Sequence, residues 1–87
     1  MAKREEQAVG LVKEIDLRGL LCPLTWARTR YALESLSPGD ELYVLLDHRP
    51  AVPDIKRNAE ELGYEILIAR ELPSAGAGAW EMRLKRA

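Results

Sequence analysis

The side chain with the clearest capacity for chemistry is the thiol of Cys22, the only cysteine among 87 residues, which is followed directly by Pro23. A single cysteine cannot form an intramolecular disulfide, so a disulfide-stapled secreted scaffold is excluded. A buried apolar filler, a nucleophile and a redox thiol all remain open. Free cysteine most often behaves as a small buried hydrophobe, so the surrounding residues must decide between these interpretations.

The pattern around Cys22 predicts the end of a strand followed by the start of a helix. Residues 11–17 alternate as a strand does, and residues 23–36 then follow a helical period, with Pro23 suited to the first helical position. At a helix N-terminus, unpaired N–H groups and the positive end of the dipole favour a thiolate. Arg18 is a candidate positive neighbour. Cys22 is therefore a candidate reactive thiol, with the buried-filler interpretation still open.

The helical stripes predict which faces are buried. In residues 23–36 the predicted inward stripe comprises Trp26, Thr29, Leu33 and Leu36, with Ala32 at its border. In the second predicted helix, residues 53–62, the stripe comprises Val52, Ile55, Ala59 and Leu62, and Gly63 suits the position after the helix end. The aromatic residues Trp26, Tyr64 and Trp80 fall on inward faces and are expected in the core.

The remaining segments complete a β-α-β-α-β-β order. Strands are predicted at residues 41–47, at 64–70 with Tyr64, Ile66 and Ile68 on one face, and at 80–85; residues 73–78 are expected to form a flexible turn. Because both helices are one-sided, we expect an α/β (α+β) two-layer sandwich, in which two helices cover one face of a four-stranded mixed sheet.

Composition places the chain among ordinary globular domains. Hydrophobic residues make up 47% and charged residues 31%, and the net charge of −1 offers no global attraction to nucleic acid or an anionic membrane. We expect a flexible tail at residues 1–9 and a single domain at 10–87. The N-terminal residues lack the apolar core of a signal peptide, and no run approaches the length of a membrane span, so a cytoplasmic location is expected.

The segment from Asp16 to Pro23, D-L-R-G-L-L-C-P, resembles the signature of the TusA/SirA family of small sulfur carriers, D-x-[RL]-G-L-x-C-P-x-P. The resemblance implies that Cys22 carries sulfane sulfur as a persulfide, with Asp16, Arg18, Gly19 and Pro23 in support and no cofactor. It also implies a donor, such as a cysteine desulfurase or a rhodanese-like protein, and an acceptor sulfurtransferase. The implied pathways are tRNA thiolation, molybdenum-cofactor synthesis or sulfur oxidation.

One position departs from the family signature. Thr25 stands where the family has its second proline, which adds a backbone N–H and a hydroxyl to the first helical turn. We expect that N–H to point towards the sulfur. The nucleophile is retained, so the departure concerns the choice of partners, because the first turn is expected to form part of the docking surface.

Other polar residues carry weaker signals. Arg49, Lys56 and Arg57 surround the start of the second helix, where solvated surface charge is the simpler interpretation and a basic docking rim the functional one. His48 has no accompanying oxyanion motif or orienting residue for a Cys–His hydrolase. One cysteine and one histidine do not make a tetrahedral zinc site, so no metal is expected.

Two further functions remain open at the sequence level. The same fold could be a non-catalytic binding or regulatory module, for which Thr25 and the modest basic rim are the motivation. A redox thiol or peroxidase would need a Cys22 that reacts with peroxide and is restored by a partner. A Cys22→Ser variant that keeps full cellular function would favour the regulatory module.

Overall fold

The computed structural model describes residues 11–86, so the expected tail at residues 1–9 lies outside the described part of the chain. The elements follow the predicted order and are β1 (Val12–Asp16), α2 (Leu24–Glu34), β2 (Glu41–Leu46), α3 (Ala51–Glu61), β3 (Glu65–Glu71), a short 3₁₀ helix η1 (Pro73–Ala75) and β4 (Trp80–Lys85). The segment expected as a flexible turn thus contains one helical turn.

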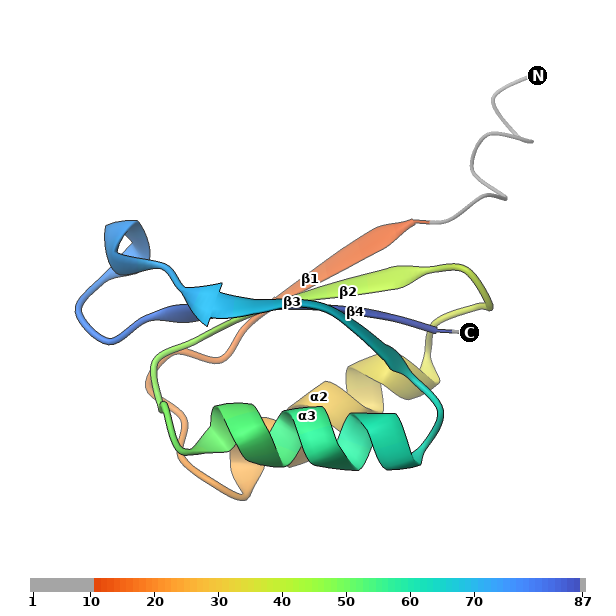
Figure 1. Ribbon diagram of the computed structural model, residues 1–87, viewed down its shortest axis with the longest axis horizontal. Coiled ribbons are helices and arrows are strands. Elements are labelled where there is room, and N and C mark those ends of the chain that lie inside the picture. The colour runs from red at the N-terminus through yellow and green to blue at the C-terminus, as the bar shows by residue number, and fades with distance from the viewer. Residues whose placement is uncertain (1–10, 87) are drawn as a thin grey trace.

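The four strands form one mixed sheet in the order β1-β2-β4-β3. β1 is parallel to β2, whereas β4 is antiparallel to both β2 and β3. The strands β1, β2 and β3 therefore end at the same edge of the sheet. α2 and α3 lie side by side beneath one face, as Figure 1 shows, which confirms the predicted two-layer architecture.

The core lies between the helices and this face of the sheet. Alternate residues of β2 and β4 point into it, as the period of a half-buried strand requires. Its fully buried large side chains include Leu33 of α2, Ile55 of α3, Leu42, Val44 and Leu46 of β2, and Met82 and Leu84 of β4. The three predicted core aromatics, Trp26, Tyr64 and Trp80, are half-buried and pack against this cluster.

The buried face of α2 differs from the predicted stripe at its start. Thr25 and Thr29 are completely buried, while Trp26, predicted as the first inward residue, is only half-buried. The hydroxyl of Thr29 donates to the carbonyl oxygen of Thr25 at 2.8 Å, which satisfies it within the helix. Because a paired hydroxyl can be buried at little cost, Thr25 takes the first inward position in place of Trp26, whereas the rest of the predicted stripe is buried as expected.

The second helix begins earlier than predicted, and its buried face includes Ala51 and not Leu62. α3 starts at Ala51 and contains Pro53 in its first turn, where a missing N–H costs no hydrogen bond. The predicted stripe residue Leu62 is 52% exposed, because the helix has already ended and the chain turns at Gly63, whose φ is +94°. Gly63 therefore has the predicted role after the helix end.

A register shift in β3 overturns the predicted alternation of that strand. Ile66 pairs with Leu84 and Ile68 with Arg83, so an extra residue lies between them. A bulge of this kind reverses the faces of the residues that follow it. Ala69, and not Ile68, consequently packs against the core beyond the bulge.

We predict that Leu33→Ala lowers the free energy of unfolding by about 2–5 kcal/mol, because it leaves a cavity at a fully buried site. Urea denaturation followed by circular dichroism measures this change. The matched control on the same helix is Tyr31→Ala, whose side chain is 76% exposed and whose effect should stay within about 0.5 kcal/mol. Equal effects of the two variants would contradict the assigned helix face.

Candidate functional site around Cys22

The thiol of Cys22 lies in the turn that connects β1 to α2, and the residue is exposed. Pro23 is the N-cap of α2, one residue before the first helical position predicted for it. Its carbonyl oxygen accepts the N–H of Ala27 at 3.0 Å, as the carbonyl of an N-cap residue does. The Cys22–Pro23 peptide bond is cis. Cys22 is thus a surface residue and not a filler of the core.

The backbone N–H groups nearest to the thiol are directed elsewhere. Those of Leu24 and Thr25 both donate to the carbonyl oxygen of Leu21, at 2.8 and 3.3 Å. The prediction that the Thr25 N–H points towards the sulfur is therefore wrong, because the tight turn before the helix uses that donor. The Thr25 hydroxyl lies 3.7 Å from Cys22 Sγ and donates to it. Thr25 is also buried, so it does not form part of an exposed docking surface.

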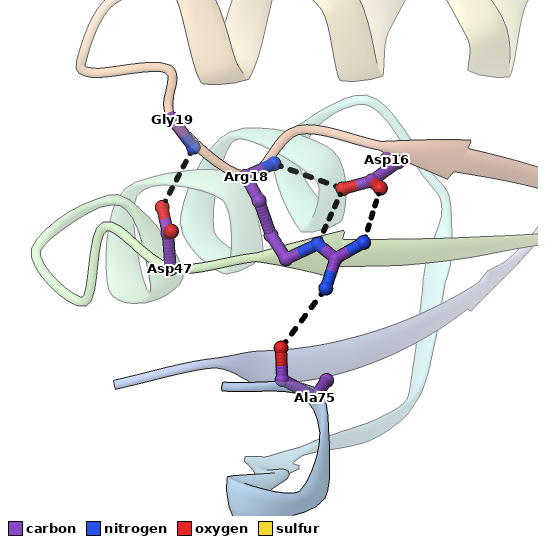
Figure 2. A network of polar contacts seen from close by, with 5 residues as sticks. All are labelled: Asp16, Arg18, Gly19, Asp47 and Ala75. Atoms are coloured by element: carbon purple, nitrogen blue, oxygen red, sulfur yellow. Dashed lines mark hydrogen bonds and ion pairs between the residues drawn. The ribbon is translucent and has the colours of Figure 1, made fainter. Parts of the chain in front are cut away.

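Gly19 connects the loop before Cys22 to the end of β2. Its N–H donates to Asp47 Oδ1 at 2.9 Å, as Figure 2 shows. Gly19 has φ +89°, a conformation that residues with a Cβ rarely adopt, so this turn requires glycine. The parallel pairing of β1 and β2 brings the two strand ends together and allows the bond. The loop that carries the thiol is thereby held to the sheet.

Arg18 is committed to partners other than the thiol. Its Nε and Nη2 donate to the two carboxylate oxygens of Asp16, at 3.0 and 2.7 Å, and its Nη1 donates to the carbonyl oxygen of Ala75 at 2.9 Å (Figure 2). No hydrogen bond between Arg18 and Cys22 is found among residues 11–86, because a carboxylate two residues away offers Arg18 a bidentate partner. Arg18 instead ties the β1 end to η1.

The same contacts shift the ionisation of both partners. Hydrogen bonds from the Arg18 side chain and backbone lower the pKa of Asp16 to about 2 from an ordinary value of 3.8. The hydrogen bond with Asp16 in turn raises the pKa of Arg18. Both groups consequently remain charged throughout the physiological pH range.

The residues of the predicted basic rim are exposed, but they are not equivalent. Arg57 forms an ion pair with Asp54 at 2.8 Å, whereas no ion pair is found for Arg49 or Lys56 among residues 11–86. Arg49 follows Asp47 by two residues and so lies at the same end of the sheet as the loop before Cys22. Lys56 lies further along α3.

Neither a metal-binding cluster nor a membrane-spanning helix is found among residues 11–86. His48 is half-buried in the turn before α3. Across residues 11–86, no group of three or more His, Cys, Asp or Glu side chains gathers to hold a metal ion. Over the same residues, neither helix is long and apolar enough to cross a membrane.

Sequence reasoning missed three features of this site. Asp47 had been placed only at a strand end, and its role as the acceptor for Gly19 depends on the strand pairing. The role of the Ala75 carbonyl as an acceptor for Arg18 could not be predicted from the sequence, because every residue has a backbone carbonyl. Leu21 and Leu24 are 61% and 52% exposed on either side of Cys22 and Pro23, which places apolar surface next to the thiol-bearing residue. The sequence signal that indicates this exposed apolar surface is the presence of leucines on both sides of Cys22 and Pro23 at a strand–helix junction.

We predict that Asp47→Ala increases the amide hydrogen-exchange rate of Gly19 about three- to tenfold, because a hydrogen bond of typical strength is lost. Exchange followed by NMR measures this rate. Asp47→Asn keeps a carbonyl oxygen and should exchange nearly as slowly as the original protein. An unchanged rate in Asp47→Ala would show that the bond does not hold the loop.

We predict that Arg18→Ala returns the pKa of Asp16 from about 2 towards its ordinary 3.8, because the variant removes the side-chain hydrogen bonds that stabilise the carboxylate. A depressed carboxyl pKa stabilises the folded state above pH 4, and this stabilisation is lost as the pH falls through 2. An NMR titration of the Asp16 carboxyl carbon measures both values. The same low pKa in both proteins would remove Arg18 as its cause.

The chain is similar in sequence to known sulfur-carrier proteins. Residues 13–86 match the protein family described as "Sulfurtransferase TusA". The "Putative sulfur carrier protein" of Archaeoglobus fulgidus is 33% identical over 87 residues, covering 99% of this chain and 96% of the relative. The "Sulfur carrier protein TusA" of Allochromatium vinosum is 32% identical over 59 residues, covering 68% of this chain and 78% of the relative.

A solved structure shows the same fold. The crystal structure of a SirA-like protein from Desulfitobacterium hafniense superimposes with a TM-score of 0.72 at 25% identity, covering 85% of this chain and 95% of that one. The family match spans the strand before Cys22, both helices and the remaining strands. The chain belongs to the TusA family of sulfurtransferases, small sulfur carriers with the SirA-like fold.

Proposed function

We propose that Cys22 accepts sulfane sulfur as a persulfide and relays it to a cysteine of a partner protein. The observation that carries the proposal is the exposure of Cys22, which lies within the family-matched residues and in a loop anchored to the sheet. Transfer of sulfur between proteins requires an accessible thiolate. A buried cysteine could not meet a donor protein's sulfur, and Cys22 can.

The proposed chemistry needs no cofactor and no external redox agent. In loading, the Cys22 thiolate attacks the outer sulfur of a donor persulfide, an S–S bond to Sγ forms, and the donor's thiolate leaves with the electron pair of the broken S–S bond. Discharge repeats the step with an acceptor's thiolate as attacker. Because the chain has no second cysteine, no internal thiol can release the sulfur as sulfide by closing a disulfide.

The surface around the thiol supports docking of a donor, such as a cysteine desulfurase or rhodanese-like protein, and of an acceptor sulfurtransferase. Leu21 and Leu24 provide exposed apolar area next to the reacting atom, and exposed apolar side chains together are typical of contact sites. Arg49 and Lys56 offer positive charge that would steer an acidic partner surface. Arg57 contributes less charge, because Asp54 already pairs with it.

We predict that incubation with a cysteine desulfurase and cysteine, without reductant, adds the mass of one sulfur atom to the intact protein. The mass increase should disappear after reduction and should be absent in Cys22→Ser, which keeps the shape of the turn but lacks the thiol. Transfer of radiolabelled sulfur to a second cysteine-containing sulfurtransferase would then measure the relay.

Two results would contradict the proposal. The first is an unmodified mass with several desulfurase and rhodanese-like donors that load another sulfur carrier in parallel. The second is a Cys22→Ser variant with full function in cells, which would favour the non-catalytic regulatory module.

A further inference from the structure

Thr25 combines burial with a direct contact to the reacting sulfur. The residue is fully buried, and its hydroxyl oxygen lies 3.7 Å from Cys22 Sγ, within hydrogen-bonding reach of a large sulfur atom. Its own backbone N–H is used by Leu21. Among residues 11–86, no other side-chain hydrogen bond to this sulfur is found. The inner side of the thiol therefore meets one fixed donor, while the residue remains exposed to solvent.

The direction of this hydrogen bond is determined by the charge on the sulfur. A thiolate has no proton to donate, so the hydroxyl must be the donor whenever Cys22 is ionised. Hydrogen bonds to a charged acceptor are stronger than those to a neutral one, and they favour the charged form. Thr25 thus stabilises the ionised sulfur more than the neutral one.

Building on the proposed sulfur relay, we propose that Thr25 is a second catalytic residue, whose hydroxyl donates to Cys22 Sγ as this atom becomes the leaving thiolate during discharge. An acceptor thiolate attacks the outer sulfur of the persulfide and a new S–S bond forms. The bond between Sγ and the outer sulfur breaks, and its electron pair goes to Sγ. A leaving sulfur that is better stabilised departs faster, so Thr25 favours release of the sulfur to the acceptor.

The other charged groups near this loop do not replace this contact. The Arg18 donors are taken by Asp16 and Ala75, and Asp47 accepts the Gly19 N–H. Thr25 is β-branched and lies on the buried face of α2, so its side chain has little freedom to turn away from the sulfur. The donor is therefore already oriented before the sulfur becomes charged.

Substitutions on α2 can distinguish the effect of the Thr25 hydroxyl from the effect of the packing of its side chain. Thr25→Val keeps the shape and removes the donor, whereas Thr25→Ser keeps the donor and loses a methyl group. Thr29→Val is the matched control, because Thr29 is equally buried on the same helix and its hydroxyl donates to a backbone carbonyl and not to sulfur. If Thr25→Val does not fold, Thr25→Ala compared with Thr25→Ser provides the same contrast.

The first measurement uses the sulfur-free protein and does not depend on the relay. At neutral pH, iodoacetamide should alkylate Cys22 about threefold more slowly in Thr25→Val than in the original protein, because the thiolate loses its hydrogen-bond donor. Thr25→Ser and Thr29→Val should retain the original rate. Equal rates for Thr25→Val and the original protein, or an equal decrease in Thr29→Val, would overturn the inference.

The second measurement follows discharge from protein loaded by a desulfurase, with glutathione as acceptor. Sulfur release from Thr25→Val should be about threefold slower, because a leaving thiolate that lacks its hydrogen-bond donor departs more slowly. Equal rates would overturn the role of Thr25. Failure of the original protein to load would contradict the sulfur relay instead, and the alkylation rate would still test the contact between Thr25 and the sulfur.

Discussion

The burial of one face of α2 against the sheet determines how the thiol is presented. Thr25, Thr29 and Leu33 are completely buried on this face, which fixes the rotation of the helix about its axis. Cys22 lies three residues before Thr25, in the turn that leads into the helix, so its sulfur has the Thr25 hydroxyl on its inner side.

The sheet topology supplies the second constraint on this loop. Because β1 and β2 are parallel neighbours, their carboxyl ends meet, and Gly19 and Asp47 can bond across the gap. Arg18 extends the connection to the carbonyl of Ala75 in η1, which follows β3. Three segments that are far apart in the sequence are thus joined at one edge of the sheet: the loop after β1, the end of β2 and η1 (Figure 2). The loop that carries Cys22 is therefore held at its two ends by β1 and α2, and between them by the hydrogen bonds to Asp47 and Ala75.

Much of the fold was predictable, because it depends on local periodicity. The order of elements and the two-layer packing follow from one-sided helices and from the strict alternation of β4. Polar residues alternate with apolar ones along β4, yet the polar residue Glu81 is only 7% exposed. Tyr43 and Arg70 on the neighbouring strands donate to its carboxylate, and the Tyr43 hydrogen bond is the main cause that lowers the pKa of Glu81. Which residues meet across neighbouring strands depends on the register of the strands, and the hydrophobic periodicity of a sequence does not specify that register.

The sequence by itself determined that one thiol stands at a strand–helix junction, in a segment with the pattern of a known family, because these properties depend on residue type and local order. The tertiary structure decided which groups face that thiol. Arg18, expected beside the sulfur, pairs with Asp16, and the Thr25 hydroxyl, rather than its N–H, reaches Sγ. These outcomes follow from competition among donors and acceptors in three dimensions, in which the turn before α2 uses the backbone N–H and the packing of α2 turns the hydroxyl inward.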